Sequence, residues 1–108
     1  YNYDGTTTGN KIGKAMASTT GWNPSNAPEG AVSNDQSSNN SSGFNAFPEG
    51  YRNYSGSFYS EGANAIFWSS SYSTTSGAFD RLLDTNYSYL ASSSYNKQNG
   101  FSVRFVRD

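Results

Sequence analysis

The chain has 108 residues, with seven basic and eight acidic side chains and neither cysteine nor histidine. This length supports one domain, and the missing residue types exclude disulfides, zinc-thiolate sites and Ser-His-Asp or Cys-His catalytic groups. The scattered, balanced charges argue against nucleic acid as a partner.

Aromatic residues make up 17% of the chain, about half of its 33% hydrophobic content, so the core must depend on a few large rings. Polarity comes from Ser, Asn, Thr and Gly rather than from charged residues, and disordered chains usually carry high net charge and few aromatics. We therefore expect a folded, loop-rich domain. No apolar run approaches the ~20 residues that cross a bilayer.

Helical spacing of apolar residues predicts a helix over residues 8–20, with one buried stripe of Ile12, Ala15 and Met16. Lys14 falls on another face of this helix. Gly21 stands where a left-handed residue ends a helix, and Trp22 follows it. Residues 23–42 are rich in Asn, Ser, Pro and Gly, which predicts a long irregular loop.

Short apolar stretches separated by turn residues predict small strands after Gly43. The candidates are residues 44–47, 65–69, 78–83, 87–91 and 101–106. The last is the clearest, because Phe101, Val103 and Phe105 alternate with other residues at the period of a strand. Residues 69–77 and 92–100 lack periodicity and are predicted to be surface loops. The fold class is therefore α+β, with one short helix, then short antiparallel strands with long irregular loops.

Four stretches in chain order carry a family resemblance: KIGKAMASTTGWN at 11–23, NDQSSNNSSGFNAFPEGYRN at 34–53, FWSSS at 67–71 and NKQNGFSVRFVRD at 96–108. The ordered set resembles the Fibrobacter succinogenes major paralogous domain family, whose members occur in exported or surface proteins. The family pattern begins earlier, so the resemblance implies that residues 1–108 form a single domain from the C-terminal portion of a longer module. Phe105 stands where many members carry cysteine.

The resemblance also implies a C-type-lectin-like fold, similar to that of the formylglycine-generating enzymes. In such folds Trp68 would anchor a strand, residues 100–107 would close the sheet, and residues 70–99 would be displayed. Neither the cysteine chemistry of those enzymes nor the calcium-binding motifs of lectins is present in this sequence.

Two sets of candidate residues follow. The expected structural core is Trp22, Phe44, Trp68, Phe101, Val103 and Phe105. The expected ligand-binding residues are Tyr72, Tyr87, Tyr89, Tyr95 and Asn96, because tyrosine among Ser and Asn resembles the composition of antibody paratopes. A solvated strand surface is the alternative for these tyrosines. Surface ion pairs best explain the charge cluster of Asp80, Arg81 and Asp84, and no carboxylate pair for glycoside hydrolysis is evident.

These features favour a non-catalytic recognition module at the cell surface of a bacterium, or secreted from it, that binds a glycan or protein partner. We expect no cofactor and no metal. The alternative is a structural subunit of an extracellular fibre, a homo-oligomer or filament joined through exposed strand edges. An enzymatic role would need catalytic groups from a preceding part of the module.

Overall fold

The computed structural model describes residues 2–107 and contains one α-helix, one 3-10 helix and five strands. The elements are α1 (Ile12–Met16), η1 (Gln36–Ser38), β1 (Tyr51–Arg52), β2 (Phe58–Tyr59), β3 (Asn64–Tyr72), β4 (Gly77–Asp84) and β5 (Ala91–Asn96). β1 and β2 form a small ribbon, and β3, β4 and β5 form an antiparallel sheet with β4 in the centre. The predicted α+β class is confirmed.

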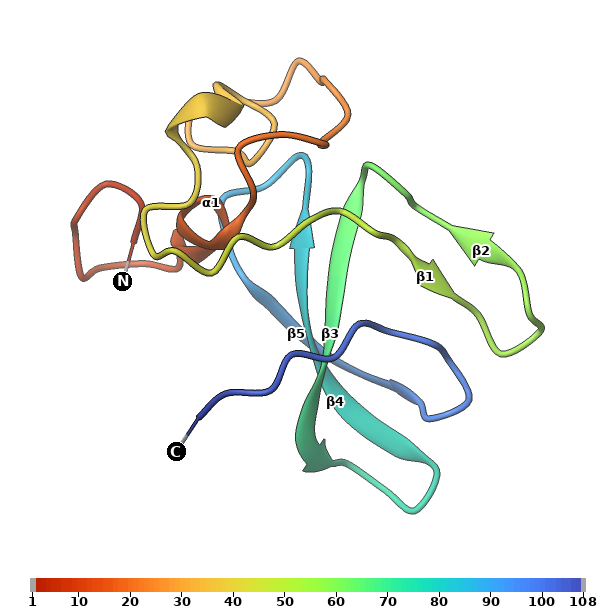
Figure 1. The fold of residues 1–108 in the computed structure, drawn as a ribbon. Coiled ribbons are helices and arrows are strands. Elements are labelled where there is room, and N and C mark those ends of the chain that lie inside the picture. The colour runs from red at the N-terminus through yellow and green to blue at the C-terminus, as the bar shows by residue number, and fades with distance from the viewer. Residues whose placement is uncertain (1, 108) are drawn as a thin grey trace.

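The helix and the long loop lie at one end of the sheet, and the β3–β4 hairpin extends to the other end (Figure 1). The C-terminal segment crosses the sheet in this view. No helix in the described part of the chain has the length and apolar character that crossing a membrane requires.

Helix α1 is much shorter than the predicted span of residues 8–20. Lys11 at its N-terminus provides no side-chain cap, and Ala17 already has extended backbone angles. Ala17 instead forms a parallel bridge with Ala46, so tertiary pairing ends the helix where its apolar pattern would continue. Gly21 has the predicted left-handed conformation, with φ of 95°, but it lies well beyond the end of the helix.

Lys14 is buried, contrary to its predicted place on a polar face of the helix. Its Nζ donates to Oδ1 of Asn39 at 2.8 Å and to backbone carbonyls of Ala31, Asn34 and Asp35. Burial lowers the pKa of Lys14. One lysine therefore supplies hydrogen bonds to much of the predicted irregular loop, which explains how a segment with little regular structure holds a defined path.

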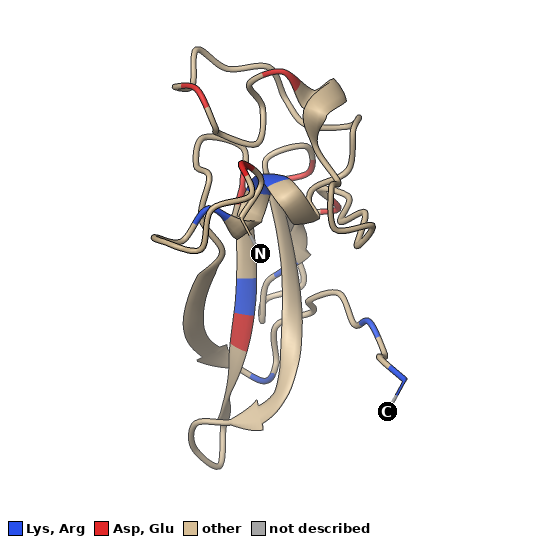
Figure 2. Ribbon diagram, turned by 90° about the vertical axis from the view of Figure 1, so that its left-hand side faces the viewer, with Lys and Arg blue, Asp and Glu red and all other residues tan. Residues whose placement is uncertain are grey.

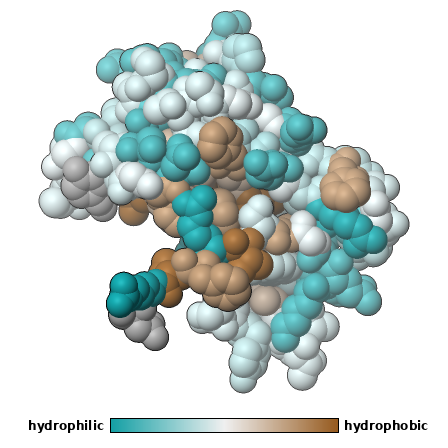
Figure 3. Space-filling model, viewed as in Figure 1, coloured by the Kyte–Doolittle hydropathy of each residue, from teal (hydrophilic) through white to brown (hydrophobic). Residues whose placement is uncertain are grey.

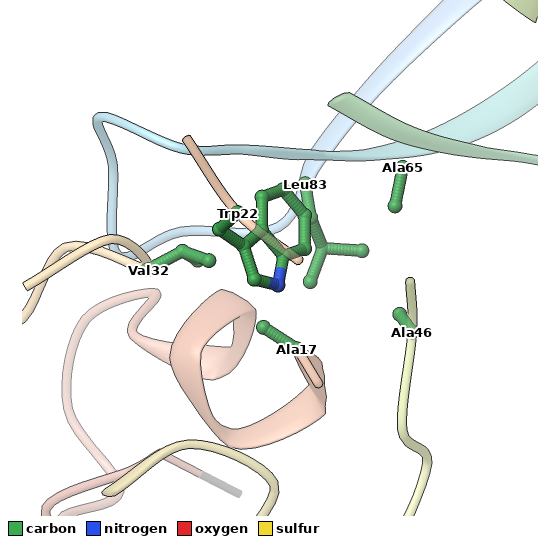
Figure 4. Close-up of a cluster of buried hydrophobic side chains, with 6 residues drawn as sticks. All are labelled: Ala17, Trp22, Val32, Ala46, Ala65 and Leu83. Carbon is green, nitrogen blue, oxygen red and sulfur yellow. The ribbon is translucent and has the colours of Figure 1, made fainter. Parts of the chain in front are cut away.

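The core lies between helix α1, the long loop and one face of the sheet. Its buried members are Ala17, Trp22, Val32, Ala46, Ala65 and Leu83 (Figure 4). Trp22 is only 3% exposed, and its Nε1 donates to Oγ of Ser18 at 3.1 Å. The predicted core role of Trp22 is confirmed, while Phe44 packs against the edge of this cluster and is half-buried.

Two of the five predicted strands match observed strands, at β3 and β4. Of the predicted strand at 87–91, residues 87–90 are a connection and only Ala91 belongs to a strand, while the Ser-rich stretch predicted as a loop at 92–100 contains most of strand β5. Six residues of β5 pair with β4, so backbone pairing creates a strand where side-chain propensity gave no signal. Residues 44–47 contribute only the bridge at Ala46.

The C-terminal segment is the clearest correction, since the predicted strand at 101–106 does not form. Gly100 pairs with Arg52 and Ser102 with Phe67, but no described backbone hydrogen bond involves residues 103–107. Val103 is 59% exposed and Phe105 is 92% exposed, so their predicted core roles are wrong. Alternation buries side chains only where a strand lies on a sheet, and this segment leaves the sheet after Ser102. Figure 3 shows hydrophobic surface along it.

Candidate functional site

One face of the three-stranded sheet carries an ordered set of side chains. Alternation along the strands and the observed register place residues in three cross-strand rows on this face. The rows are Tyr72–Ala78–Tyr95, Trp68–Asp80–Ser93 and Ile66–Leu82–Ala91. The opposite face contributes Ala65 and Leu83 to the core.

Phe101 is the centre of an aromatic cluster on this face. Its ring centroid lies 4.3 Å from that of Trp68 in a tilted stack. Tyr95 and Tyr51 meet it edge to face, with centroids 5.6 and 5.9 Å away. Such pairs contribute ~0.5–1.5 kcal/mol beyond buried area. Phe101 and Trp68 are half-buried rather than fully buried, so the two rings predicted as core form the base of a surface site.

A pocket of about 380 Å³ opens beside this cluster. Its size falls within the ~300–1,000 Å³ of typical small-ligand sites. Rings, two aliphatic side chains and four small polar side chains line it: Tyr51, Tyr54, Tyr95, Phe101, Ile66, Leu82, Asn53, Ser60, Asn64 and Asn99. No charged side chain is among them. The pocket therefore combines apolar surface with neutral hydrogen-bonding groups.

Hydrogen bonds hold the three amides of the pocket in place. Oδ1 of Asn53 accepts from the backbone N–H groups of Ser55 and Ser57, and Oδ1 of Asn99 accepts from that of Tyr54 at 3.0 Å. Nδ2 of Asn64 donates to Oδ2 of Asp84. Within residues 2–107, Nδ2 of Asn53 and Oδ1 of Asn64 make no hydrogen bond. The two N–H groups on Nδ2 of Asn53 and the amide oxygen of Asn64 are thus available to a ligand.

Asp80 lies in the middle row of the same face, opposite Trp68, and is fully buried. Oδ1 of Asp80 accepts from the backbone N–H of Ser93 at 2.7 Å, whereas Oδ2 has no hydrogen-bond partner among the described residues. Burial raises the pKa of Asp80 above its ordinary value. The carboxyl is therefore buried opposite Trp68 in the sheet and does not line the pocket.

The predicted surface ion pairs of the charge cluster are not present in the described residues. Arg81 donates to the backbone oxygen of Asp80 and to Oγ of Ser92. Asp84 accepts from Nδ2 of Asn64 at 2.9 Å and from the backbone N–H of Asn86. The prediction failed because strand alternation separates Asp80 from the exposed Arg81, which the spacing of charges alone does not reveal.

The Fibrobacter succinogenes major domain model matches residues 2–107 of this chain. The chain belongs to this family. Comparisons with curated proteins and with solved structures give no match. The family resemblance is confirmed, while no structural neighbour supports the C-type-lectin-like fold. All residues that line the pocket lie within the region that matches the Fibrobacter succinogenes major domain.

In this family member the predicted tyrosines do not form one face. Tyr95 lines the pocket and Tyr72 lies in the same cross-strand row. Tyr87 and Tyr89 stack on each other, with centroids 4.9 Å apart, in the connection between β4 and β5. That connection lies beside α1 at the other end of the sheet (Figure 1). The predicted ligand-binding set is therefore divided between two distant places.

The amide predicted to bind ligand, Asn96, shapes a turn instead. Its Oδ1 accepts from the backbone N–H of Gln98, and its carbonyl accepts from Asn99. Asn99 lines the pocket, and so do Tyr51, Asn53 and Asn64, none of which was predicted from the sequence as a binding residue. The one available signal was the Tyr- and Asn-rich composition of residues 51–54, which resembles that of the displayed region.

Proposed function

We propose that this domain is a non-catalytic recognition module that binds a glycan in the pocket beside Phe101. The observation that carries the proposal is the combination of exposed rings and fixed amides in one cavity without a charged side chain. Sugars present apolar C–H faces, which pack on aromatic rings, and hydroxyl groups, which exchange hydrogen bonds with amides. The available donor of Asn53 and acceptor of Asn64 suit such hydroxyls.

The placement of the acids supports a binding role rather than hydrolysis. Glycoside hydrolysis uses two carboxyl groups that flank the bond to be cleaved. Asp80 is fully buried, and Asp84 accepts hydrogen bonds from Asn64 and Asn86. Neither carboxyl lines the pocket.

An extracellular or outer-surface location belongs to the same proposal. Its support is the family membership together with the Ser-, Asn- and Tyr-rich composition. A C-type-lectin-like display of the pocket by the segment between Trp68 and Phe101 remains a prediction.

Alanine variants tested against an array of neutral and acidic oligosaccharides would examine the proposal. Tyr95→Ala and Asn99→Ala should each weaken binding, with the ring truncation costing about 2 kcal/mol or more, roughly thirtyfold in affinity. Tyr87→Ala is the matched control, because its ring is similarly exposed but lies far from the pocket. Equal losses for Tyr87→Ala and Tyr95→Ala, or no binding by the parent protein, would contradict the proposal.

The second candidate function is a structural subunit, and the outer edge of β5 favours it. β5 pairs with β4 on one side, and no described strand pairs with its other side. Open edges are templates for pairing with another chain. Light scattering across a range of protein concentrations and negative-stain imaging would test this function. A mass that stays at one chain at high concentration would exclude it.

A further inference from the structure

A second pocket adjoins the first on the same face of the sheet. It measures about 290 Å³ and is lined by Trp68, residues 69–71, Tyr72, Ala78 and Lys97. Trp68 stacks on Phe101, which lines the first pocket. Ala78 lies directly opposite Tyr95 across the sheet, and side chains so placed have Cβ atoms ~4.5–5.5 Å apart. One extended ligand can therefore contact both pockets.

The second pocket differs from the first because it contains a cation. Nζ of Lys97 lies 5.2 Å from the centre of the Tyr72 ring and donates to the carbonyl of Thr75 at 3.1 Å. An ammonium group has three donors, so two remain after this hydrogen bond. Among the described residues the one ion pair joins Lys11 and Asp4, and Lys97 has no carboxylate partner. Lys97 and Tyr72 both line the pocket, so a cation without a carboxylate partner among the described residues lies at its wall.

The distribution of charge around the pocket favours an anion. Most acidic positions lie around the helix and the long loop, and few lie towards the hairpin end of the sheet (Figure 2). Lys97 is at that end, because Asn96 pairs with Gly77 and the backbone N–H of Lys97 donates to the carbonyl of Ser76. The acid nearest along β4 is Asp80, which is fully buried, and burial raises its pKa. A positive local potential increases the local concentration of anionic ligands.

We propose that the second pocket binds the carboxylate of a uronic acid unit in a glycan whose neighbouring unit occupies the first pocket. This inference rests on the proposed function and extends it from glycans in general to acidic glycans. Lys97 provides the charge-assisted hydrogen bond to the carboxylate. Tyr72 provides a ring against which the sugar packs, and Trp68 separates the two subsites while it supports Phe101.

Titration calorimetry with one ligand in two charge states tests the proposal. The ligands are an oligogalacturonide of four units and its methyl ester, which keeps the sugar chain and removes the negative charge. The parent protein should bind the acid at least about tenfold more tightly than the ester, a difference of about 1.4 kcal/mol. The preference should shrink as salt is raised, because salt screens exposed charges.

Lys97→Gln should remove the preference for the acid, so that this variant binds the acid and the ester with similar affinity. Lys11→Gln is the matched control, since that lysine is paired with Asp4 away from both pockets, and it should retain the preference. Circular dichroism melts would establish that both variants are folded.

Equal binding of acid and ester, or an unchanged preference in Lys97→Gln, would overturn this inference and leave the proposed function intact. Binding of neutral oligosaccharides but not of acidic ones would also overturn this inference and leave the proposed function intact. Absence of binding to every oligosaccharide would instead contradict the proposed function, together with the inference that depends on it.

Discussion

Trp68 and Asp80 lie directly opposite each other on β3 and β4, so an indole ring and a fully buried carboxyl share the base of the candidate site. Phe101 contacts the rings on both flanking strands, Trp68 on β3 and Tyr95 on β5. Oδ2 of Asp80 has no partner among the described residues. The folded state therefore favours the neutral form of this carboxyl.

The first prediction concerns the pH dependence of stability. Because the pKa of Asp80 in the folded protein is raised above 3.8, the folded protein binds this proton more tightly than the unfolded chain does. The loss of folding stability that this group causes is absent below pH 3.8, grows as the pH rises to the raised pKa, and is complete above it. Asp80→Asn, which cannot ionise, should raise the melting temperature at pH 7 by about 4–8 °C for each ~1 kcal/mol gained.

Thermal melts of the parent and Asp80→Asn at pH 3.5 and pH 7 would measure this effect. The difference between the two proteins should be large at pH 7 and small at pH 3.5. Glu29→Gln at an exposed position is the control and should change neither melt. A difference that is the same at both pH values would assign the effect to hydrogen bonding rather than to charge.

The second prediction is that alanine in place of Gly13 destabilises the protein, although alanine favours helices more than glycine does. In an exposed helix interior, Gly to Ala stabilises by about 1 kcal/mol. Here a Cβ on Gly13 would lie 2.6 Å from the carbonyl oxygen of Tyr89 and 2.9 Å from that of Ser88. Both are backbone atoms, so the connection before β5 must move. Gly13→Ala should lower the melting temperature by several degrees, and a higher melting temperature would contradict the observed packing of α1.

The third prediction concerns Lys14, which joins α1 to the long loop. Lys14→Met keeps the length and apolar stem of the side chain but removes every donor to Asn39 and the loop carbonyls. Buried acceptors left without partners cost ~1–3 kcal/mol. Hydrogen exchange should show lost protection in residues 31–39, and Lys97→Met at an exposed site is the control. Unchanged protection would mean that the loop is held by its apolar residues alone.

The fourth prediction compares the two tryptophans. Trp22 is almost fully buried within the core, whereas Trp68 is half-buried in the surface cluster. Trp22→Ala should cost ~3–5 kcal/mol of folding free energy. Trp68→Ala should cost less, because part of its ring already contacts solvent. Urea unfolding would rank the two variants, and an equal or larger cost for Trp68→Ala would place the main core on the other face of the sheet.

Several parts of this fold could be predicted from the sequence because their signals are local. Apolar stretches predicted β3 and β4. The position of Trp22 directly after a glycine that ends a helical pattern predicted that this tryptophan lies in the core. Strand β5 could not be predicted, because its Ser-rich sequence forms a strand only through pairing with β4. The helix was overestimated because its apolar spacing continues past the point where Ala17 pairs with Ala46.

The candidate site was predicted only in part for a related reason. Tyr95 and Tyr72 were chosen by composition, and so were Tyr87 and Tyr89, which the chain reversal at the end of β4 places at the opposite end of the sheet. The pocket amides Asn53 and Asn99 gave no signal in so Asn-rich a chain. Their roles depend on the pairing of Arg52 with Gly100, a contact between distant segments that composition does not encode.

The last prediction tests the C-terminal segment, in which two phenylalanines have opposite environments. Phe101 contacts three rings, while Phe105, four residues later, is 92% exposed. Phe101→Ala should destabilise the fold by about 2–4 kcal/mol, toward the lower part of the range for buried rings because Phe101 is half-buried. It should also weaken glycan binding, since its ring lines the pocket.

Phe105→Ala should leave both the melting temperature and glycan binding unchanged, because an exposed side chain has no packing to lose. Differential scanning fluorimetry and calorimetry on the same two variants would measure both quantities. Arg104 already packs on the ring of Phe44. If Phe105→Ala destabilised the domain as much as Phe101→Ala, the Phe105 side chain would also pack against the protein in solution. The alternation that predicted a strand at 101–106 would then describe a real contact, and Val103→Ser should show the same loss.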